Sequence, residues 1–188
     1  QMYFGDHNKE LELGDRITPA FEIAAGKWFT PSIGTRLMVH GFSYKGATQN
    51  GAHSTGVDVP KPDGYDGWWG LTYQEYPFFN AHVDFLFNLS NIIAGYREDR
   101  FWDIQPYVGV GWICTWDEPK NQSVTYAAGI LNSFRLGERF DIYLDVRGGM
   151  MADTFEGEIG GRNHEGNMSA TLGLSYNFNK RGFDRSQM

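Results

Sequence analysis

The sequence predicts an all-β protein, and more closely an eight-stranded, antiparallel, up-and-down transmembrane β-barrel. Three observations lead to this prediction. Glycine makes up 24 of the 188 residues, roughly twice its usual share of about 7%, while aromatic residues make up 16% and charged residues only 21%. Apolar and polar residues alternate along several segments, as in strands with one apolar face. The connectors between these segments alternate between short and long, which is typical of membrane barrels.

The clearest alternation covers residues 168–178. Leu172 and Leu174 lie on one face of this segment, and Thr171 lies on the other. No segment of comparable length has a helical period, and residues 88–100 are expected to carry one helical turn. Comparable or weaker alternation predicts six further strands, at residues 20–28, 33–44, 79–88, 104–113, 122–134 and 140–147.

Connector lengths predict the topology. Residues 45–70 and 153–166 are long and polar, whereas 29–32 and 136–139 are tight turns. Bacterial barrels of this kind have short periplasmic turns, longer outer loops and an even number of strands. We therefore expect the long loops to be extracellular, and the short turns and the C-terminus to be periplasmic. An even number requires an eighth strand, and Gln1–Phe4 resembles its final residues, so the first strand is expected to be incomplete in this chain.

The composition of the two strand faces favours a membrane barrel over a soluble one. The apolar face carries almost no charge, and the polar face is rich in small residues rather than lysine. A sheet face exposed to water normally carries charged side chains, with lysine particularly common on the edge strands. Aromatic residues near the strand ends, such as Trp102 and Trp116, resemble the girdles at membrane interfaces. Pro106 lies on the lipid face inside a strand, where we expect a bulge or a missing hydrogen bond.

Charge and motifs argue against several classes of function. The formal net charge is −7 and the isoelectric point about 5.1, so no nucleic-acid partner is expected. The single cysteine, Cys114, cannot form an internal disulfide or a multi-cysteine metal site. Neither G-x-S-x-G nor H-E-x-x-H occurs. We therefore expect no enzyme activity, no metal and no cofactor.

Charged side chains on the inward strand face form the main candidate site. An unpaired charge in a narrow lumen is costly, so these residues should pair with one another or with water. We interpret them as a network that plugs the lumen, because eight strands leave little open space; an ion path or gate is the alternative. Phe42, Tyr44, Tyr107 and Tyr143 should add to the plug. The predicted lumen charge network consists of Glu22, Arg36, His40, Asp84, Asp141, Asp145 and Arg147, and His82 and Asp103 share its face.

The tight turn at 29–32 allows one pairing to be predicted. An even register around it places Glu22 opposite Met38 or His40 and leaves Arg36 within diagonal reach of a long side chain. Both charges point inward, and each would be costly without a partner. We therefore expect Glu22 and Arg36 to pair, directly or through water.

A weaker candidate lies in the long connector at 45–70. Asp58, Asp63 and Asp66 are interspersed there with glycine and proline. Carboxylates and backbone carbonyls can hold Ca²⁺, although this spacing does not match an EF-hand loop. The three aspartates are a candidate ion site, and a loop of ordinary Asp, Gly and Pro turns is the favoured alternative.

Three stretches extend the prediction from a fold to a family. They resemble the N-terminal barrel of OmpA-type outer-membrane proteins, and they read AHVDFLFNLSNIIAGYREDRFWDIQPYVGVGW (81–112), QMYFGDHNKELELGDRITPAFEIAAGKWF (1–29) and LGLSYNFNKRGF (172–183). The resemblance implies a barrel domain over residues 1–180, whose first strand begins upstream of Gln1. It also implies a periplasmic linker over 181–188, which in such proteins leads to a peptidoglycan-binding domain. No position here matches the peptidoglycan-binding residues of that domain.

The resemblance implies a structural integral protein of the outer membrane that maintains envelope integrity and tethers the membrane to peptidoglycan through a further domain. The expected partners are outer-membrane lipids and lipopolysaccharide, peptidoglycan through that domain, and other outer-membrane proteins. A narrow porin for ions or small solutes is the first alternative. A membrane-embedded enzyme would need a rim cluster of Ser, His and acid, and a soluble ligand-binding barrel would be independent of detergent.

Overall fold

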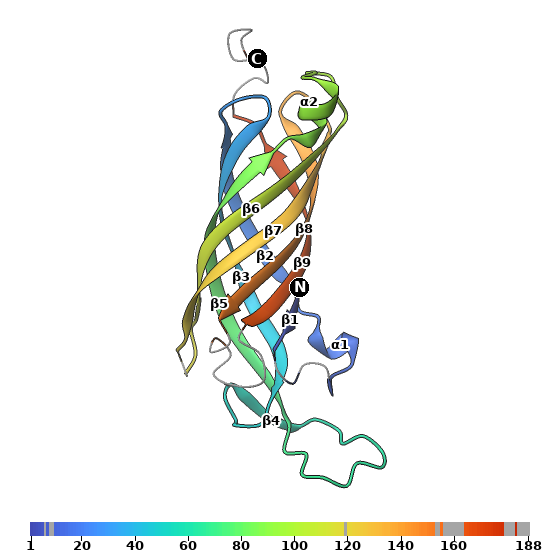
Figure 1. Cartoon of the computed structure of the whole chain (residues 1–188), viewed down its shortest axis with the longest axis vertical. Helices are drawn as coiled ribbons and strands as arrows, with labels where there is room; N and C mark the ends of the chain where they lie inside the picture. Colours follow the sequence, from blue (N-terminus) through green and yellow to red (C-terminus); the bar gives the residue numbers. More distant parts are fainter. Residues whose placement is uncertain are drawn as a thin grey trace.

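A single antiparallel sheet, curled around a central lumen, makes up most of the protein (Figure 1). The computed structural model describes residues 1–5, 7, 10–118, 120–152, 155, 164–178 and 183. The all-β prediction is confirmed, since the two helices found there are short. The elements are β1 (Met2–Phe4), α1 (Leu13–Arg16), β2 (Ala20–Trp28), β3 (Ile33–Thr48), β4 (Ser54–Asp58), β5 (Thr72–Phe87), α2 (Leu89–Ala94), β6 (Trp102–Thr115), β7 (Gln122–Arg135), β8 (Phe140–Ala152) and β9 (His164–Tyr176).

Strands that are neighbours in the sheet are almost always neighbours along the chain. The hydrogen-bonded order is β1–β9–β8–β7–β6–β5–β3–β2, with β4 joined to β5 as a side branch. All of these pairs are antiparallel. There are two exceptions: β3 pairs with β5 because β4 is the side branch between them, and β1 pairs with β9, with Met2 opposite Met168. This order confirms the predicted up-and-down topology.

β1 and β2 are the two end strands of this order, and they are joined by backbone contacts around Met2 and Ile17. Met2 forms an isolated bridge with Ile17. Beside it, the Gln1 nitrogen donates to the Thr18 carbonyl at 2.7 Å, and the Thr18 N–H donates to the Gln1 carbonyl at 2.9 Å. Among the described strands, the other edge of β2 (Ala20–Trp28) has no ladder partner. The sheet is therefore not a continuous ring, and we call the open line between β2 and β9 the seam.

All seven predicted strand segments are strands in the structure, and Gln1–Phe4 supplies β1. The helical turn predicted within 88–100 is α2. The Asn88 side chain caps it, because its Oδ1 accepts the Asn91 N–H at 2.9 Å. α1 and β4 are not predicted from the sequence, because both are short and lack a periodic pattern.

β3 and β5 are longer than their alternation predicts. Each has 16 residues, and they pair without a shift as far as Thr48↔Thr72. A strand needs about 9–11 residues to cross a bilayer, so several residues of each strand lie beyond that length. We call this part, residues 45–75 with β4, the distal hairpin; it projects past the other strands (Figure 1). A small apolar cluster stabilises it, made of Leu11, Ala47, Val59 and Leu71 with Trp69 and Tyr73 packed against it.

Pro106 causes no bulge, so of the two expected outcomes the missing hydrogen bond is the one that fits the structure. The register between β6 and β7 passes through it without a shift. On the other edge of β6, the ladder with β5 ends at Tyr107, next to the proline. On that same edge the Ile104 N–H donates to the Ser90 hydroxyl of α2 at 3.0 Å. Alternate residues of a strand direct their N–H groups to the same edge, so Pro106 lacks its N–H where the ladder has already ended.

Phe42 points outward rather than inward, which corrects a second prediction. Its side chain is 59% exposed, whereas Tyr44 two residues later is buried in the lumen. The backbone explains the change, because Phe42 has a φ of 142°, a region that side chains other than glycine rarely occupy. This local twist reverses the facing of one residue in the middle of β3.

The two ends of the sheet differ as the connector lengths predict. The turn between β2 and β3, α2 and the turn between β7 and β8 lie at one end, which we call the turn end (Figure 1). α1 and the distal hairpin lie at the other, which we call the loop end. The connector at 153–166 follows β8 at the loop end and lies mostly outside the described residues, as does most of 181–188.

Candidate functional site

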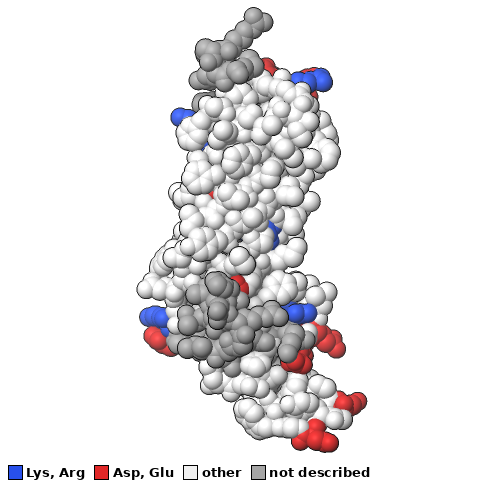
Figure 2. All heavy atoms as spheres, in the orientation of Figure 1, with Lys and Arg blue, Asp and Glu red and all other residues white. Residues whose placement is uncertain are grey.

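The outer surface of the sheet is apolar between its two ends. On β9, Leu172 and Leu174 are 75% and 63% exposed, while the alternate residue Thr171 is turned inward, as the sequence predicts. Figure 2 shows that charged side chains on the visible face gather toward the two ends, with a nearly uncharged belt between them. An apolar exterior around a polar lumen is the arrangement of β-sheet proteins in lipid.

Neither of the helices among the described residues has the length and apolar character that a membrane span requires.

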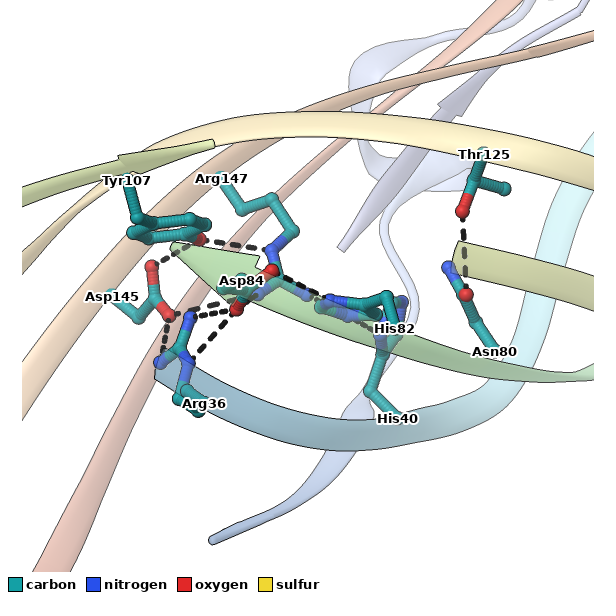
Figure 3. A network of polar contacts seen from close by, with 9 residues as sticks. All are labelled: Arg36, His40, Asn80, His82, Asp84, Tyr107, Thr125, Asp145 and Arg147. Carbon is teal, nitrogen blue, oxygen red and sulfur yellow. Dashed lines mark hydrogen bonds and ion pairs between the residues drawn. The ribbon is translucent and has the colours of Figure 1, made fainter. Parts of the chain in front are cut away.

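Arg36 is at the centre of a network of buried ion pairs in the lumen (Figure 3). It lies on β3 directly opposite Asp84 of β5, and its Nε and Nη2 atoms donate to Asp84 Oδ2 at 2.9 and 2.7 Å. Its Nη1 atom donates across the lumen to Asp145 Oδ2 of β8 at 2.9 Å. A guanidinium presents its N–H groups in a rigid fork, so one arginine can join carboxylates on two strands.

Arg147 of β8 completes the network from the opposite wall. Its Nη2 atom donates to Asp84 Oδ2 at 3.1 Å, and its Nε donates to the Tyr107 hydroxyl of β6 at 2.9 Å. That hydroxyl donates in turn to Asp145 Oδ1 at 2.7 Å. The guanidinium groups of Arg36 and Arg147 also lie over the Tyr107 ring, 4.7 and 5.2 Å from its centroid. Tyr107 therefore holds both arginines in place.

Two histidines extend the network toward the loop end. His82 Nδ1 lies 2.8 Å from Asp84 Oδ1, and His82 Nε2 contacts Arg147 Nη1. His40 Nδ1 lies 3.3 Å from the same Nε2 atom. Because arginine can only donate, His82 Nε2 is the acceptor from Arg147, and His82 Nδ1 carries the proton that is donated to Asp84. The network thus fixes one tautomer of His82.

Glycines on the neighbouring strands leave room for these side chains. A Cβ atom at Gly109 of β6 would collide with the Asp84 carboxylate. A Cβ atom at Gly129 of β7 would collide with the ring and hydroxyl of Tyr107. Glycine in a strand often marks such a close approach. Part of the high glycine content of the chain therefore reflects the filling of the lumen.

The four charged members at the centre of the network are balanced. Arg36 and Arg147 face Asp84 and Asp145, and all four side chains are at most 8% exposed. Removing one partner of a buried pair is strongly destabilising, because it leaves the other charge without compensation. The arrangement links β3, β5, β6 and β8 across the lumen. Chemically it can hold these strands together and obstruct the lumen. We call these four residues with Tyr107, His82 and His40 the ionic network.

An apolar cluster fills the lumen nearer the loop end. The rings of Tyr44 and Phe78 stack with centroids 4.0 Å apart, and Tyr3 stacks on Tyr44 at 4.9 Å. Asn167 donates to the Tyr44 hydroxyl at 2.7 Å, and His40 meets the Phe78 ring edge-on at 5.6 Å. His40 thereby joins this cluster to the ionic network. We call it the aromatic cluster, and its buried members are Tyr3, Tyr44, Tyr76, Phe78, Ile113, Met151 and Phe155.

The structure brings together most of the residues predicted for the lumen. Two of them lie apart. Asp141 is buried near the turn end and accepts a hydrogen bond from Asn177 Nδ2 at 3.1 Å. Glu22 is half-buried on β2 beside the seam. Those that meet in the ionic network are Arg36, His40, Asp84, Asp145 and Arg147.

Glu22 and Arg36 do not form the direct ion pair that was one of the two expected forms of contact, whereas one of the two predicted registers is correct. Glu22 lies opposite His40. Arg36 lies four residues away along β3, and its ion pairs among the described residues are with Asp84 and Asp145. Aspartates on β5 and β8 reach Arg36 directly, so Glu22 is not needed to compensate its charge.

The three aspartates of the long connector do not form a common site. Asp58, Asp63 and Asp66 are each exposed in the distal hairpin. Within the described part of the chain, no group of three His, Cys, Asp or Glu residues is placed to hold a metal ion. The geometry fits the loop of ordinary turns.

Two features of the lumen are missing from the sequence prediction. The alternation places Tyr107 on the inward face without assigning it a partner. The facing glycines, Gly129 in particular, are the signal that a large side chain fills this level. The aromatic cluster is harder to predict, because Tyr3 and Phe155 come from regions outside the long alternating segments.

The fold and the lumen define a class: an antiparallel β-sheet protein with an uncharged outer belt and a charged, filled interior. The chain is similar to Outer membrane protein 41 of Porphyromonas gingivalis, at 28% identity over 150 residues that cover 77% of this chain and 34% of the relative. It is also similar to Outer membrane protein 40 of the same organism, at 26% identity over 190 residues that cover 95% of this chain and 44% of the relative. The chain thus spans less than half the length of these curated relatives.

No family model matches the chain, and no solved structure matches it. The two relatives therefore carry the comparison. Their names and the uncharged belt agree in pointing to an outer-membrane protein.

Proposed function

We propose that this chain is a structural integral protein of the outer membrane with a mostly plugged lumen. The observation that carries the proposal is the buried, charge-balanced ionic network inside a wall whose visible outer face is nearly uncharged between its two ends. The similarity to two named outer-membrane proteins supports the location. The role assigned to the lumen is mechanical rather than catalytic: it stabilises the wall and blocks passage, and so maintains envelope integrity.

We propose further that the sheet closes into an eight-stranded barrel by a strand that continues β1 along the seam. β1 already pairs with β9 on one side and bridges to Ile17 on the other. Continuing both registers backward from Met2 places one strand of roughly eight residues between β2 and β9. Without it, the N–H and C=O groups of two edges would lack partners in lipid, where each unsatisfied group costs several kcal/mol.

Amide hydrogen exchange on the full-length gene product in lipid vesicles tests the closure. A closing strand should protect the β2 amides of Ala20–Trp28 to the same degree as those of β7. Fast exchange along both edges of the seam would show that the barrel is open there.

The plug predicts no steady open pore, only rare small openings. Recording in planar lipid bilayers on the full-length gene product measures this. A large, constant conductance would favour the alternative function, a narrow porin for ions or small solutes. A structure with a continuous column of water past Arg36 and Arg147 would also favour the narrow porin.

The proposed orientation places the loop end outside the cell and the turn end in the periplasm. Its support is the distribution of connector lengths, since outer-membrane barrels have long outer loops and short periplasmic turns. Protease added to intact cells should cut within 45–70 and leave 136–139 intact. Cleavage near 136–139 in intact cells would invert the orientation.

Tethering to peptidoglycan is proposed for a domain outside residues 1–188. The support is the resemblance to OmpA-type proteins and the greater length of both relatives. Sedimentation with purified peptidoglycan compares the full-length gene product with residues 1–188. Sedimentation of the full-length product alone supports the tether, whereas any other result contradicts this assignment. Outer-membrane lipids, lipopolysaccharide and other outer-membrane proteins are the remaining proposed partners.

A further inference from the structure

A shallow hollow opens on the outward face of β5 and β6, close to the loop end. Its volume is about 390 Å³, and it is lined by Phe79, Trp112, Cys114, Thr115, Trp116 and Lys120. The hollow forms because a small side chain stands among large ones. Cys114 lies opposite Phe79 of β5; Trp112 precedes it on the same face of β6, and Trp116 follows it directly after the end of β6.

We propose that this hollow binds an acyl chain of the lipid A part of lipopolysaccharide, with Lys120 contacting a phosphate of the same molecule. The inference rests on the proposed outer-membrane location and on the loop end facing outward. It adds a specific lipid site to a surface that would otherwise contact lipid without preference.

The walls of the hollow suit an acyl chain. Trp112 and Trp116 are 45% and 62% exposed, and both lie on the face that continues the uncharged belt. Trp116 meets Phe79 edge-on, with ring centroids 6.3 Å apart and planes at 84°, so the two rings support each other. An unfilled hollow would deprive these side chains of van der Waals contacts on one side, and an acyl chain restores them. Tryptophan is also the residue expected at headgroup level.

The charge at the rim suits a phosphate. Lys120 is exposed, and its closest carboxylate is Glu118 at 3.7 Å, which is also exposed. Such surface pairs contribute little, so the ammonium group is available to a phosphate, which lysine binds as a point charge. Asp117 and Glu118 in the same turn do not exclude the ligand, because Mg²⁺ is commonly held between carboxylates and phosphates. Lipid A combines phosphates with acyl chains, and under the proposed orientation it is the lipid of this leaflet.

Lipid retention tests the site. The full-length gene product is purified from outer membranes in mild detergent with Mg²⁺, and bound lipid A and phospholipid are counted by native mass spectrometry. Cys114→Phe fills the hollow, and Lys120→Gln removes the charge. Ala170→Phe is the matched control, because it adds the same ring at another small, outward-facing residue, on β9.

We expect Cys114→Phe to abolish lipid A retention and Lys120→Gln to weaken it about tenfold, the loss of one hydrogen bond to a charged group. Ala170→Phe should retain lipid A like the unmutated protein. Equal retention in all variants would refute the site, and retention of phospholipid in place of lipid A would refute the choice of ligand. If Cys114→Phe fails to insert into the membrane, lipid A retention by Lys120→Gln, a change in the exposed turn, still tests the site. Failure of the unmutated protein to enter bilayers would contradict the proposed function instead.

Discussion

The ionic network and the aromatic cluster fill the same lumen at two levels by opposite chemistry. Nearer the turn end, four charged side chains meet through hydrogen bonds of 2.7 to 3.1 Å. Nearer the loop end, rings stack face to face, as Tyr44 and Phe78 do at 4.0 Å. Asn80 and Thr125 lie beside His82 and His40 in the same part of the lumen, and the Thr125 hydroxyl lies 3.5 Å from Asn80 Oδ1 (Figure 3).

The difference between the two levels is in how each responds to a missing member. Losing part of a ring leaves a space that neighbouring apolar side chains can partly fill. Losing one charge leaves another buried charge without compensation, and no rotation of a neighbour can replace it. The ionic network should therefore set the correct arrangement of strands and the barrier to ions, whereas the aromatic cluster should contribute stability that tolerates change.

The largest effect is expected at Asp84. Asp84→Ala removes the carboxylate that Arg36 and Arg147 share, at a side chain with no exposure. The free energy of unfolding should fall by about 3–5 kcal/mol, and openings in planar bilayers should become frequent. Urea unfolding from lipid vesicles measures the first, with Asp84→Asn as the control of equal shape. A loss below about 1 kcal/mol with unchanged conductance would remove the distinction between the two levels.

A charge placed outside the wall should be costly for a different reason. Leu172→Arg puts a guanidinium on the outward apolar face of β9 and should cost about 2–4 kcal/mol if it lies near the middle of the bilayer. Thr171→Ser, on the inward face of the same strand, should cost far less. Unfolding from vesicles compares the two variants. Equal losses would mean that the facing of β9 is misassigned.

A conservative change in the aromatic cluster should have a modest effect. Phe78→Leu loses the stacking on Tyr44 but keeps an apolar side chain of similar size, so we expect a loss of about 1 kcal/mol. Conductance should stay at the level of the unmutated protein, because the ionic network remains intact. Frequent openings in this variant would show that the aromatic cluster, rather than the ions, forms the barrier.

The smallest effect is expected where an arginine and an aspartate pair in solvent. Arg97 donates to Asp99 at 3.1 and 2.8 Å between α2 and β6, and this hydrogen bonding holds the pKa of Asp99 below its ordinary value. A lowered pKa of this kind would stabilise the folded state at pH values above the unfolded-state pKa. That stabilisation would be lost as the pH falls through the folded-state pKa. Both side chains are exposed, so screening should leave no measurable effect. Asp99→Asn should therefore unfold like the unmutated protein from acid to neutral pH, and a clear acid-dependent difference would contradict this.

Alternation predicts a strand well where one face meets lipid and the other meets the lumen. Residues 168–178 show this, because Leu172 and Thr171 have different surroundings. The distal hairpin lacks that contrast, and there the backbone ladder continues to Thr48↔Thr72 without an apolar period to reveal it. β3 also shows that one residue can depart from the period, since the positive φ of Phe42 turns its side chain outward.

The candidate site is predictable in its members but not in its pairs. Period 2 assigns Arg36, Asp84 and Asp145 to the inward face, and each is buried there. Which of them meet depends on the stagger and curvature of the whole sheet, because Arg36 reaches Asp145 from β3 to β8. The register of one hairpin could therefore suggest Glu22 as a partner and still miss the carboxylate from the opposite wall.

The pairing of Met2 with Met168 has a consequence for how this protein folds. The other strands of the main sheet order pair with the next strand of that order, so their pairing closes loops far shorter than the whole sheet. The ladder between β1 and β9 joins residues from opposite ends of the sequence, and contacts at such separation form slowly because of the entropy of loop closure. Until that step, two strand edges stay open to pairing with another chain. We therefore expect aggregation to be most frequent in the interval before β1 and β9 pair.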